Sequence, residues 1–169
     1  MTHEFRRIVT GHDAQGKSVV VIDGPPTAAG AFWLTASAPA DNQSAGDGAE
    51  MVRKLEPSNG GSIFRCAVIP PEDPNVSPEE RERATARMFA QMEATHCRTD
   101  TSRHPGMHKT RTVDYVVLLS GEVTLLLDKG EVDLKPFDVV VQRGTSHAWV
   151  NKGKEPALIA AVLVDAKEL

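Results

Sequence analysis

The sequence lacks several features that would assign it to a class of protein at once. It has only two cysteines, Cys66 and Cys97, whose spacing matches neither a metal-binding knuckle nor a redox pair, so we expect a reducing, cytoplasmic setting. Lysine and arginine number 19 against 23 acidic residues, and the net charge of −4 argues against a nucleic-acid partner. The longest apolar run, Ala157–Val164, is too short to cross a membrane, and no hydrophobic signal segment follows the N-terminus.

The composition that remains is that of a globular protein. The 169 residues include 40% hydrophobic and 25% charged side chains, which is ordinary for a folded chain. A chain of this length can bury a sizeable core without the support of disulfide bonds or structural metal ions, so we expect one domain.

Short runs of β-branched and aliphatic residues dominate the chain from Thr112 onward, and turn residues such as Ser120-Gly121 separate them. Six runs at this density, with no helix between them, predict an antiparallel sandwich or barrel and disfavour a parallel sheet. The predicted strands are Val113–Leu119, Glu122–Leu127, Val132–Leu134, Phe137–Val141, His147–Val150 and Ala157–Val164.

The N-terminal part is predicted to add further strands. A turn at Gly11–Gly16 separates the first two runs and indicates a hairpin or two neighbouring strands. The segment Pro39–Asn59 is rich in Gly, Ser, Asp and Asn, which predicts a long loop. The predicted strands in this part are Phe5–Thr10, Lys17–Ile22, Ala31–Ala36 and Ser62–Ile69.

One helix is predicted over residues 77–93. Ser77 is a suitable N-cap, Pro78 fits the first helical position, and Glu80 completes a capping box. Apolar side chains then follow at intervals of four, which indicates a narrow stripe for packing. The stripe consists of Ala84, Met88 and Met92, with Phe89 beside them.

Histidines and one acid recur at spacings that a strand places on one face. Side chains two, four or six positions apart in a strand point the same way, and this relation holds for His108, Thr110, Thr112 and Asp114. If the later strand that begins at His147 meets this one inside a barrel, His108, Asp114 and His147 converge. Two imidazoles and a carboxylate suit a divalent ion such as Fe, Mn, Ni or Zn, with positions left open for water and substrate.

Two strings of the sequence resemble a known family. They are His108-Lys-Thr-Arg-Thr-Val-Asp-Tyr115 and Val141-Gln-Arg-Gly-Thr-Ser-His-Ala-Trp149. Together with Gly121 and Asn151 they are similar to the two signature motifs of the cupin superfamily, and closest to its small single-domain members. The likeness extends over residues 104–164. It implies an all-β fold, a double-stranded β-helix or jelly-roll barrel with a cavity for a small molecule.

The resemblance assigns a role to each matching position. His108 takes the place of the first metal-binding histidine, Thr110 the second, Asp114 the glutamate and His147 the histidine of the second motif. A complete cupin site implies three histidines and one glutamate on a metal, so this chain keeps two histidines and one acid. His104 has the right parity to supply the missing ligand, although a Pro-Gly pair interrupts the strand after it.

We therefore expect one barrel with additions. Residues 1–70 are expected to add strands and a loop that pack on the barrel, residues 71–103 a helical connection, and residues 104–169 the barrel itself. Cupins commonly pair through such extra strands, so the resemblance also implies a homodimer. The residues expected to line the substrate pocket are Thr110, Tyr115, Gln142 and Trp149.

Some of these residues also have a purely structural interpretation. His147 can close a turn by hydrogen bonding, and Asp114 can pair with Arg111 at the surface. An acid within a mostly apolar strand needs a buried partner, however, which favours a metal or pocket role for Asp114. Adjacency of His96 and Cys97 does not make a nucleophile, because it does not supply an activated thiolate. We expect His96, like His3 and His12, at the surface.

Three interpretations of function stay open. The first is an enzyme that acts on a small organic molecule with a divalent metal on His108, Asp114 and His147; the resemblance permits dioxygenase, decarboxylase, isomerase or dehydratase chemistry. The second is a metal-free enzyme in which His108 or His147 is the general acid or base. The third is a non-catalytic small-molecule-binding or regulatory protein with a vestigial metal site, which the threonine at position 110 favours.

Overall fold

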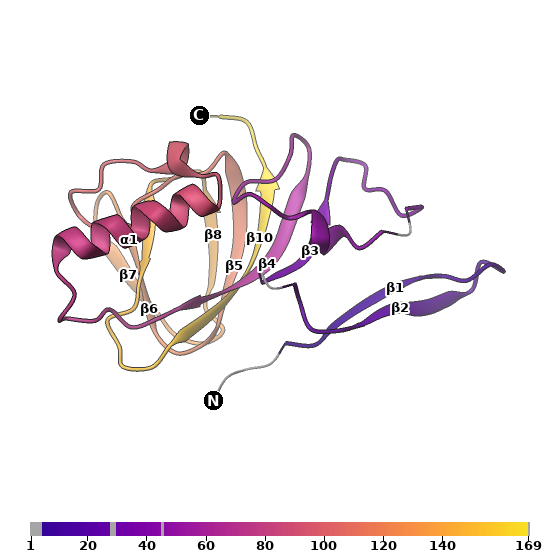
Figure 1. Ribbon diagram of the computed structural model, residues 1–169, viewed down its shortest axis with the longest axis horizontal. Helices are drawn as coiled ribbons and strands as arrows, with labels where there is room; N and C mark the ends of the chain where they lie inside the picture. Colours follow the sequence, from indigo (N-terminus) through magenta and orange to yellow (C-terminus); the bar gives the residue numbers. More distant parts are fainter. Residues whose placement is uncertain (1–4, 28–29, 45, 169) are drawn as a thin grey trace.

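Strands dominate the computed structural model, which describes residues 5–27, 30–44 and 46–168 (Figure 1). They form three antiparallel sheets. The first pairs β1 (Arg7–His12) with β2 (Ser18–Gly24). The five-stranded sheet has the order β3 (Ala31–Thr35), β4 (Ser62–Ile69), β10 (Ala157–Asp165), β5 (Thr112–Ser120), β8 (Val139–Arg143). The three-stranded sheet has the order β7 (Glu131–Leu134), β6 (Val123–Leu127), β9 (His147–Val150).

The two larger sheets close on one hydrophobic core. Along β5 the side chains alternate, with Thr112, Asp114, Val116 and Leu118 buried and Tyr115 exposed, as a strand with one inward face requires. Residues of both sheets meet in a single apolar cluster. Its buried members are Val116, Leu118, Val123, Leu125, Leu134, Ala157, Ile159, Ala161 and Leu163. The fold is therefore an all-β jelly-roll barrel, as predicted.

The six strands predicted after Thr112 are confirmed, with one correction. The start of β8 was expected at Phe137, but the strand begins at Val139. Phe137 has φ 77° and donates its N–H to the Leu118 carbonyl at 2.7 Å. A residue in the left-handed region ends strand pairing, so Phe137 belongs to the turn before β8.

The turn between β5 and β6 requires a glycine. Gly121 has φ 77°, and a Cβ at this position would lie 2.7 Å from the Cα of Ala157. Any larger residue would push β10 away from β5, so this glycine of the first motif has a packing role.

The predicted helix is confirmed as α1 (Pro78–Gln91), with the Ser77–Glu80 capping box in place. The side chain that packs α1 against the protein is not in the expected stripe: Phe89 is the buried side chain of α1, whereas Met88 is 47% exposed. Phe89 packs with Ala94 and Cys97 in a small apolar cluster. That cluster fixes α1 against the segment that leads into the barrel.

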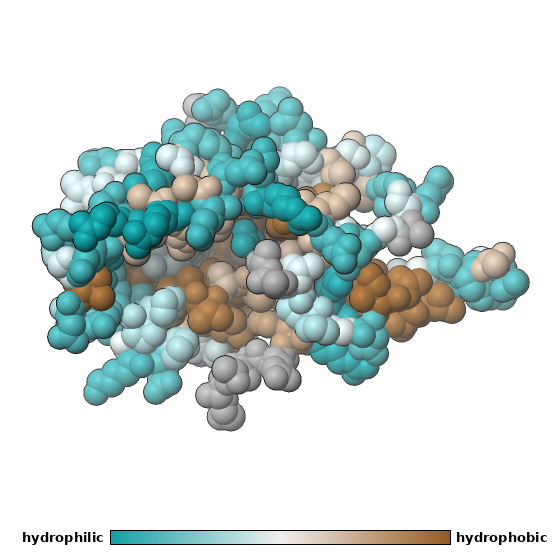
Figure 2. Space-filling model, viewed as in Figure 1, coloured by the Kyte–Doolittle hydropathy of each residue, from teal (hydrophilic) through white to brown (hydrophobic). Residues whose placement is uncertain are grey.

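The predicted N-terminal hairpin is also confirmed, and it projects away from the barrel (Figure 1). A buried ion pair ties its base to the remainder of the chain: the Arg7 guanidinium donates to both carboxylate oxygens of Asp47, at 2.7 and 2.5 Å, and to the Phe32 carbonyl at 3.1 Å. Figure 2 shows apolar side chains gathered on this projecting hairpin. The two other predicted N-terminal strands, β3 and β4, extend the five-stranded sheet beyond β10.

The expected long loop contains one short helical turn, a 3-10 helix at Gly48–Met51 with Asp47 as its cap. A second 3-10 turn, Thr95–Cys97, follows α1. In the described part of the chain, no helix is both long and apolar enough to span a membrane.

Candidate functional site

Two histidines from distant parts of the sequence lie side by side where β9 begins. The backbone N–H of His108 donates to the carbonyl of His147 at 2.9 Å, and the reverse bond has the same length. The two ring centroids are 4.3 Å apart. Phe89 of α1 lies 5.1 Å from the His108 ring, and Trp149 meets the His147 ring edge-on at 5.6 Å. Packed rings on both sides hold the two imidazoles in place.

Backbone carbonyls determine which nitrogen of each ring carries the proton. Nδ1 of His108 lies 2.8 Å from the Gly106 carbonyl, and Nδ1 of His147 lies 3.0 Å from the Thr145 carbonyl. Because a carbonyl oxygen only accepts hydrogen bonds, each Nδ1 carries the proton and each Nε2 keeps a lone pair. This is the tautomer of histidines that bind a metal through Nε2.

Both imidazoles are neutral at physiological pH. Burial lowers the pKa of His108, and burial together with the nearby His108 lowers the pKa of His147 to about 3. Neutral imidazole is the form that binds metals. With a pKa of about 3, the His147 ring is a weak proton acceptor near neutral pH.

A buried acid lies on the inward face of the neighbouring sheet. Asp114 is only 6% exposed, and its Oδ1 has no hydrogen-bond partner. Burial raises the pKa of Asp114 to about 6; the Thr112 hydroxyl lowers it by hydrogen bonding, and the charge of Glu56 raises it. Thr112 in turn bonds the hydroxyl of Thr110 at 2.6 Å. A buried carboxylate oxygen without a hydrogen bond destabilises the fold. Asp114 is therefore better suited to bind a ligand or a proton than to stabilise the protein.

The three predicted metal ligands do not meet at one point as they stand. Within the ranges that the structure describes, one set of three His, Cys, Asp or Glu donors has all its ligand atoms within 4.8 Å of one another, and it consists of Glu56, His96 and Cys97. The Nε2 lone pairs of His108 and His147 are the donors that this pair offers to a divalent ion.

The predicted lining residues occupy different places. Thr110 and Gln142 are buried, and Gln142 lies opposite Asp114 in the β5–β8 register. The Gln142 amide donates to the carbonyl of Thr145 at 3.1 Å and also contacts its hydroxyl. Gln142 therefore braces the turn that carries His147. Trp149 packs partly against the main core as well as on His147.

Tyr115 was expected on the pocket wall and is not there. It is 52% exposed on β5, because neighbours of Asp114 in a strand point to the opposite face. His104 does not replace the missing ligand either. Its Nε2 lies 2.8 Å from Glu72, and its Nδ1 accepts the Gly106 N–H at 3.0 Å.

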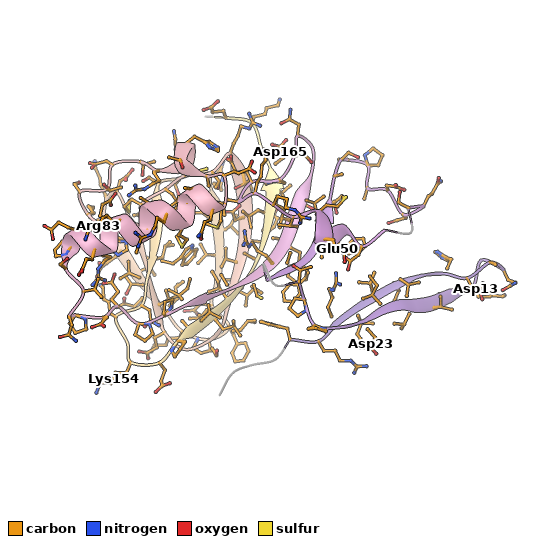
Figure 3. All side chains as sticks on the ribbon, in the orientation of Figure 1. Asp13, Asp23, Glu50, Arg83, Lys154 and Asp165 are labelled. Carbon is orange, nitrogen blue, oxygen red and sulfur yellow. The ribbon has the colours of Figure 1, made fainter. Side chains whose placement is uncertain are left out.

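A pocket of about 350 Å³ opens at the end of the barrel where β10 finishes. Asp165, labelled in Figure 3, marks this end. Thr110 lines the pocket, whereas His108, Asp114 and His147 lie outside its lining. The lining residues are Glu56, His96, Cys97, Lys109–Val113, Arg143, Gly144 and Ala166–Glu168.

Sequence reasoning missed the group formed by Glu56, His96 and Cys97. His96 is 67% exposed, as expected of a surface residue, but its Nε2 lies 2.7 Å from Glu56 Oε2 and 3.5 Å from Cys97 Sγ. Burial and the adjacent Glu56 carboxylate raise the pKa of Cys97 to about 12, so the thiol is protonated and not an activated nucleophile. The His-Cys adjacency was a signal for this group, but nothing in the sequence pointed to Glu56.

Comparison with known proteins gives a family match to part of the chain. Residues 97–164 match the family model described as Cupin domain. This range contains both motifs and all three of the predicted metal ligands.

The similar proteins match only part of this chain in sequence. Phomopsin biosynthesis cluster protein C' of Diaporthe leptostromiformis is 55% identical over 47 residues, which cover 27% of this chain and 25% of that protein. The cupin-domain-containing oxidoreductase srdD of Neurospora crassa is 40% identical over 67 residues, 37% of this chain and 34% of that protein. The match therefore spans about a quarter to about a third of the length of these two relatives. A Cupin 2 conserved barrel domain protein from Salinispora arenicola has 16% identity and a TM-score of 0.39, over 62% of this chain and 64% of that chain.

Proposed function

We propose, from the match of residues 97–164 to the cupin domain family model, that this chain is a cupin enzyme acting on a small organic molecule. The observation that carries the proposal is the pair of neutral imidazoles, His108 and His147, whose rings lie 4.3 Å apart; the inward face of β5 adds a buried acid, Asp114, with one unbonded carboxylate oxygen. Oxidoreductase chemistry is the class to test first, because the Neurospora relative carries that name.

We propose that Nε2 of His108 and Nε2 of His147 bind a divalent ion such as Fe, Mn, Ni or Zn, with Asp114 as a third ligand after its side chain turns. When bound, such an ion polarises a carbonyl or enolate oxygen or activates water or oxygen. The chain supplies the remainder of the site. Carbonyls hold each Nδ1 proton away from the ion, and burial keeps both rings uncharged.

The end pocket supplies a route for the substrate. Its volume of about 350 Å³ suits a small molecule. The side chains of Thr110 and Thr112 connect its wall to Asp114 by hydrogen bonds. We propose that a bound molecule displaces this threonine pair to meet the histidines and the acid.

Metal analysis tests this assignment directly. Protein purified without chelator is expected to hold about one divalent ion at the histidine pair, and His147→Ala to lose that ion while Tyr115→Phe, on the outer face, keeps it. Turnover of small organic substrates, screened with oxidant or reductant present, should disappear with chelator and return with the ion. Wild-type protein whose metal content equals that of His147→Ala would remove the metal from the proposal.

A second candidate is a metal-free enzyme in which Asp114 moves the proton. It is favoured by the separation of the three donors, which do not share one point. A buried carboxyl that titrates near neutrality is well matched to general acid–base catalysis. Activity that survives chelation but is lost in Asp114→Asn would select this candidate over the metal enzyme.

We further propose that the chain forms a homodimer through its hairpin and the outer face of the five-stranded sheet. A two-stranded hairpin alone is marginally stable in water, and the β1–β2 hairpin exposes Val20 and Val21 by more than half (Figure 2). The outer sheet face presents a matching apolar row. This row crosses β4, β10, β5 and β8 through Phe64, Val162, Tyr115 and Val141.

The mass in solution tests the dimer. Light scattering should give twice the chain mass for the wild type and the chain mass for Val20→Lys. Val132→Lys is the matched control, because Val132 is 50% exposed on β7, away from both proposed surfaces. A monomeric wild type, or a Val20→Lys dimer as tight as the wild type, would contradict this assembly.

A further inference from the structure

We propose that Glu56, His96 and Cys97 form a zinc site in the wall of the end pocket, separate from the histidine pair. Among the described residues this is the one set of three potential ligands whose donor atoms already lie within 4.8 Å of one another. The set joins a carboxylate from the loop before β4 with an imidazole and a thiol from the 3-10 turn after α1.

The three donors converge on one small region. Nε2 of His96 faces both Oε2 of Glu56, at 2.7 Å, and Sγ of Cys97, at 3.5 Å. With tetrahedral angles and ordinary zinc bond lengths, the sulfur and nitrogen ligands of one zinc ion lie about 3.6 Å apart and the nitrogen and oxygen ligands about 3.4 Å apart. The sulfur–nitrogen separation already matches. The imidazole and the carboxylate need to open by about 0.7 Å, which the exposed His96 side chain permits.

Backbone hydrogen bonds orient the ligands before an ion arrives. Oε1 of Glu56 accepts the Arg111 N–H at 2.7 Å, which directs Oε2 toward His96. The carbonyl of Cys97 accepts the Lys109 N–H at 2.8 Å, and the Cys97 side chain is buried beside Phe89. Such outer contacts fix ligands in functional metal sites.

The ligand chemistry selects the metal and leaves room for a further ligand. A thiolate, an imidazole and a carboxylate are the donors that Zn²⁺ takes in proteins, and three protein ligands leave a fourth position open. All three residues line the pocket of about 350 Å³, so a ligand at the open position comes from the space that the proposed function assigns to the substrate. Lys109, Arg111 and Arg143 line the same pocket, which favours an anionic fourth ligand.

Cobalt titration of the full chain tests the site, because cobalt bound to a thiolate absorbs in the near ultraviolet. Chelator-stripped wild-type protein should show this band with one equivalent of Co²⁺, and Zn²⁺ should abolish it. The band should vanish in Cys97→Ser, and Co²⁺ affinity at this site should fall at least about tenfold in His96→Gln. His96→Gln should fold even if Cys97→Ser does not, because His96 is exposed whereas Cys97 is buried.

Two controls separate this site from its alternatives. Cys66→Ser should keep the band, because the second thiol lies on β4 outside the pocket. His147→Ala should also keep it, so that failure of the buried histidine site and failure of this site are distinguishable. No thiolate band at saturating Co²⁺, or a band of unchanged affinity in His96→Gln, would overturn the proposal.

Discussion

The buried carboxyl of Asp114 should destabilise the metal-free protein, and replacing it with asparagine should therefore stabilise the fold. Asp114 is 6% exposed, and its Oδ1 is buried without a partner. Asparagine has nearly the same shape but no charge. The gain should appear only where the carboxyl of the wild type is ionised, since a protonated carboxyl and an amide are similar in polarity.

The shift in pKa gives the magnitude and the sign. Burial raises the pKa of Asp114 from 3.8 to about 6, and two pKa units correspond to about 3 kcal/mol. Because the pKa is higher in the folded state, the stability that Asp114 contributes is fully present below about pH 4 and is lost as pH rises through 6. A buried amide also loses hydrogen bonds to water, so we expect Asp114→Asn to gain about 2 kcal/mol at pH 8.

Urea denaturation with chelator present measures this gain at pH 4 and pH 8. Asp114→Asn should unfold at higher urea than the wild type at pH 8 and at nearly the same urea at pH 4. Glu122→Gln at the exposed β5–β6 turn is the control, and should leave both midpoints unchanged. An Asp114→Asn protein that is less stable than the wild type at pH 8 would refute the interpretation of Asp114 as an uncompensated acid.

Three further changes test how the site is supported. Arg7→Ala should lower the free energy of unfolding by about 3 kcal/mol, because it leaves Asp47 largely buried without its guanidinium partner; urea midpoints will measure the loss, and a loss below 1 kcal/mol would mean that water replaces Arg7. Phe89→Ala should lower the free energy of unfolding by about 3–5 kcal/mol and make the His108 ring, which Phe89 contacts, more mobile. Urea unfolding will measure the first effect, and the NMR line widths of the His108 ring protons will measure the second. Ser77→Ala should lower the free energy of unfolding by about 1 kcal/mol, because it removes the α1 cap. The melting temperature should fall while the metal content stays unchanged; an unchanged melting temperature would contradict the cap's role.

Much of the fold could be predicted because strands alternate with a period of two and end at recognisable turns. The same period predicted that Thr112 and Asp114 face inward on β5, and the buried positions agree. It should also have excluded Tyr115 from the pocket, since an odd offset from Asp114 places a residue on the outer face. Phe137 could not be assigned from its residue type, because a large apolar residue seldom takes a positive φ.

The parts of the site that sequence did not predict depend on long-range packing. Spacing placed His108 and Asp114 on one face, and the convergence with His147 was predicted only on the condition that the two strands meet inside a barrel. Spacing gave no information on how far Asp114 extends toward the histidines. Glu56 comes from a loop without periodicity, so only the folded chain brings it to His96 and Cys97. Local pattern determines which face a residue occupies, whereas the distance between side chains on different segments is set by the three-dimensional arrangement.

The most direct test of the central claim is anomalous diffraction from crystals grown with a saturating divalent ion, recorded at that ion's absorption edge. We predict a peak about 2.0–2.2 Å from Nε2 of both His108 and His147, with the carboxylate of Asp114 turned toward it. A map without a peak between these two imidazoles, while both rings keep their places beside Phe89 and Trp149, would contradict the claim that the paired histidines bind a metal.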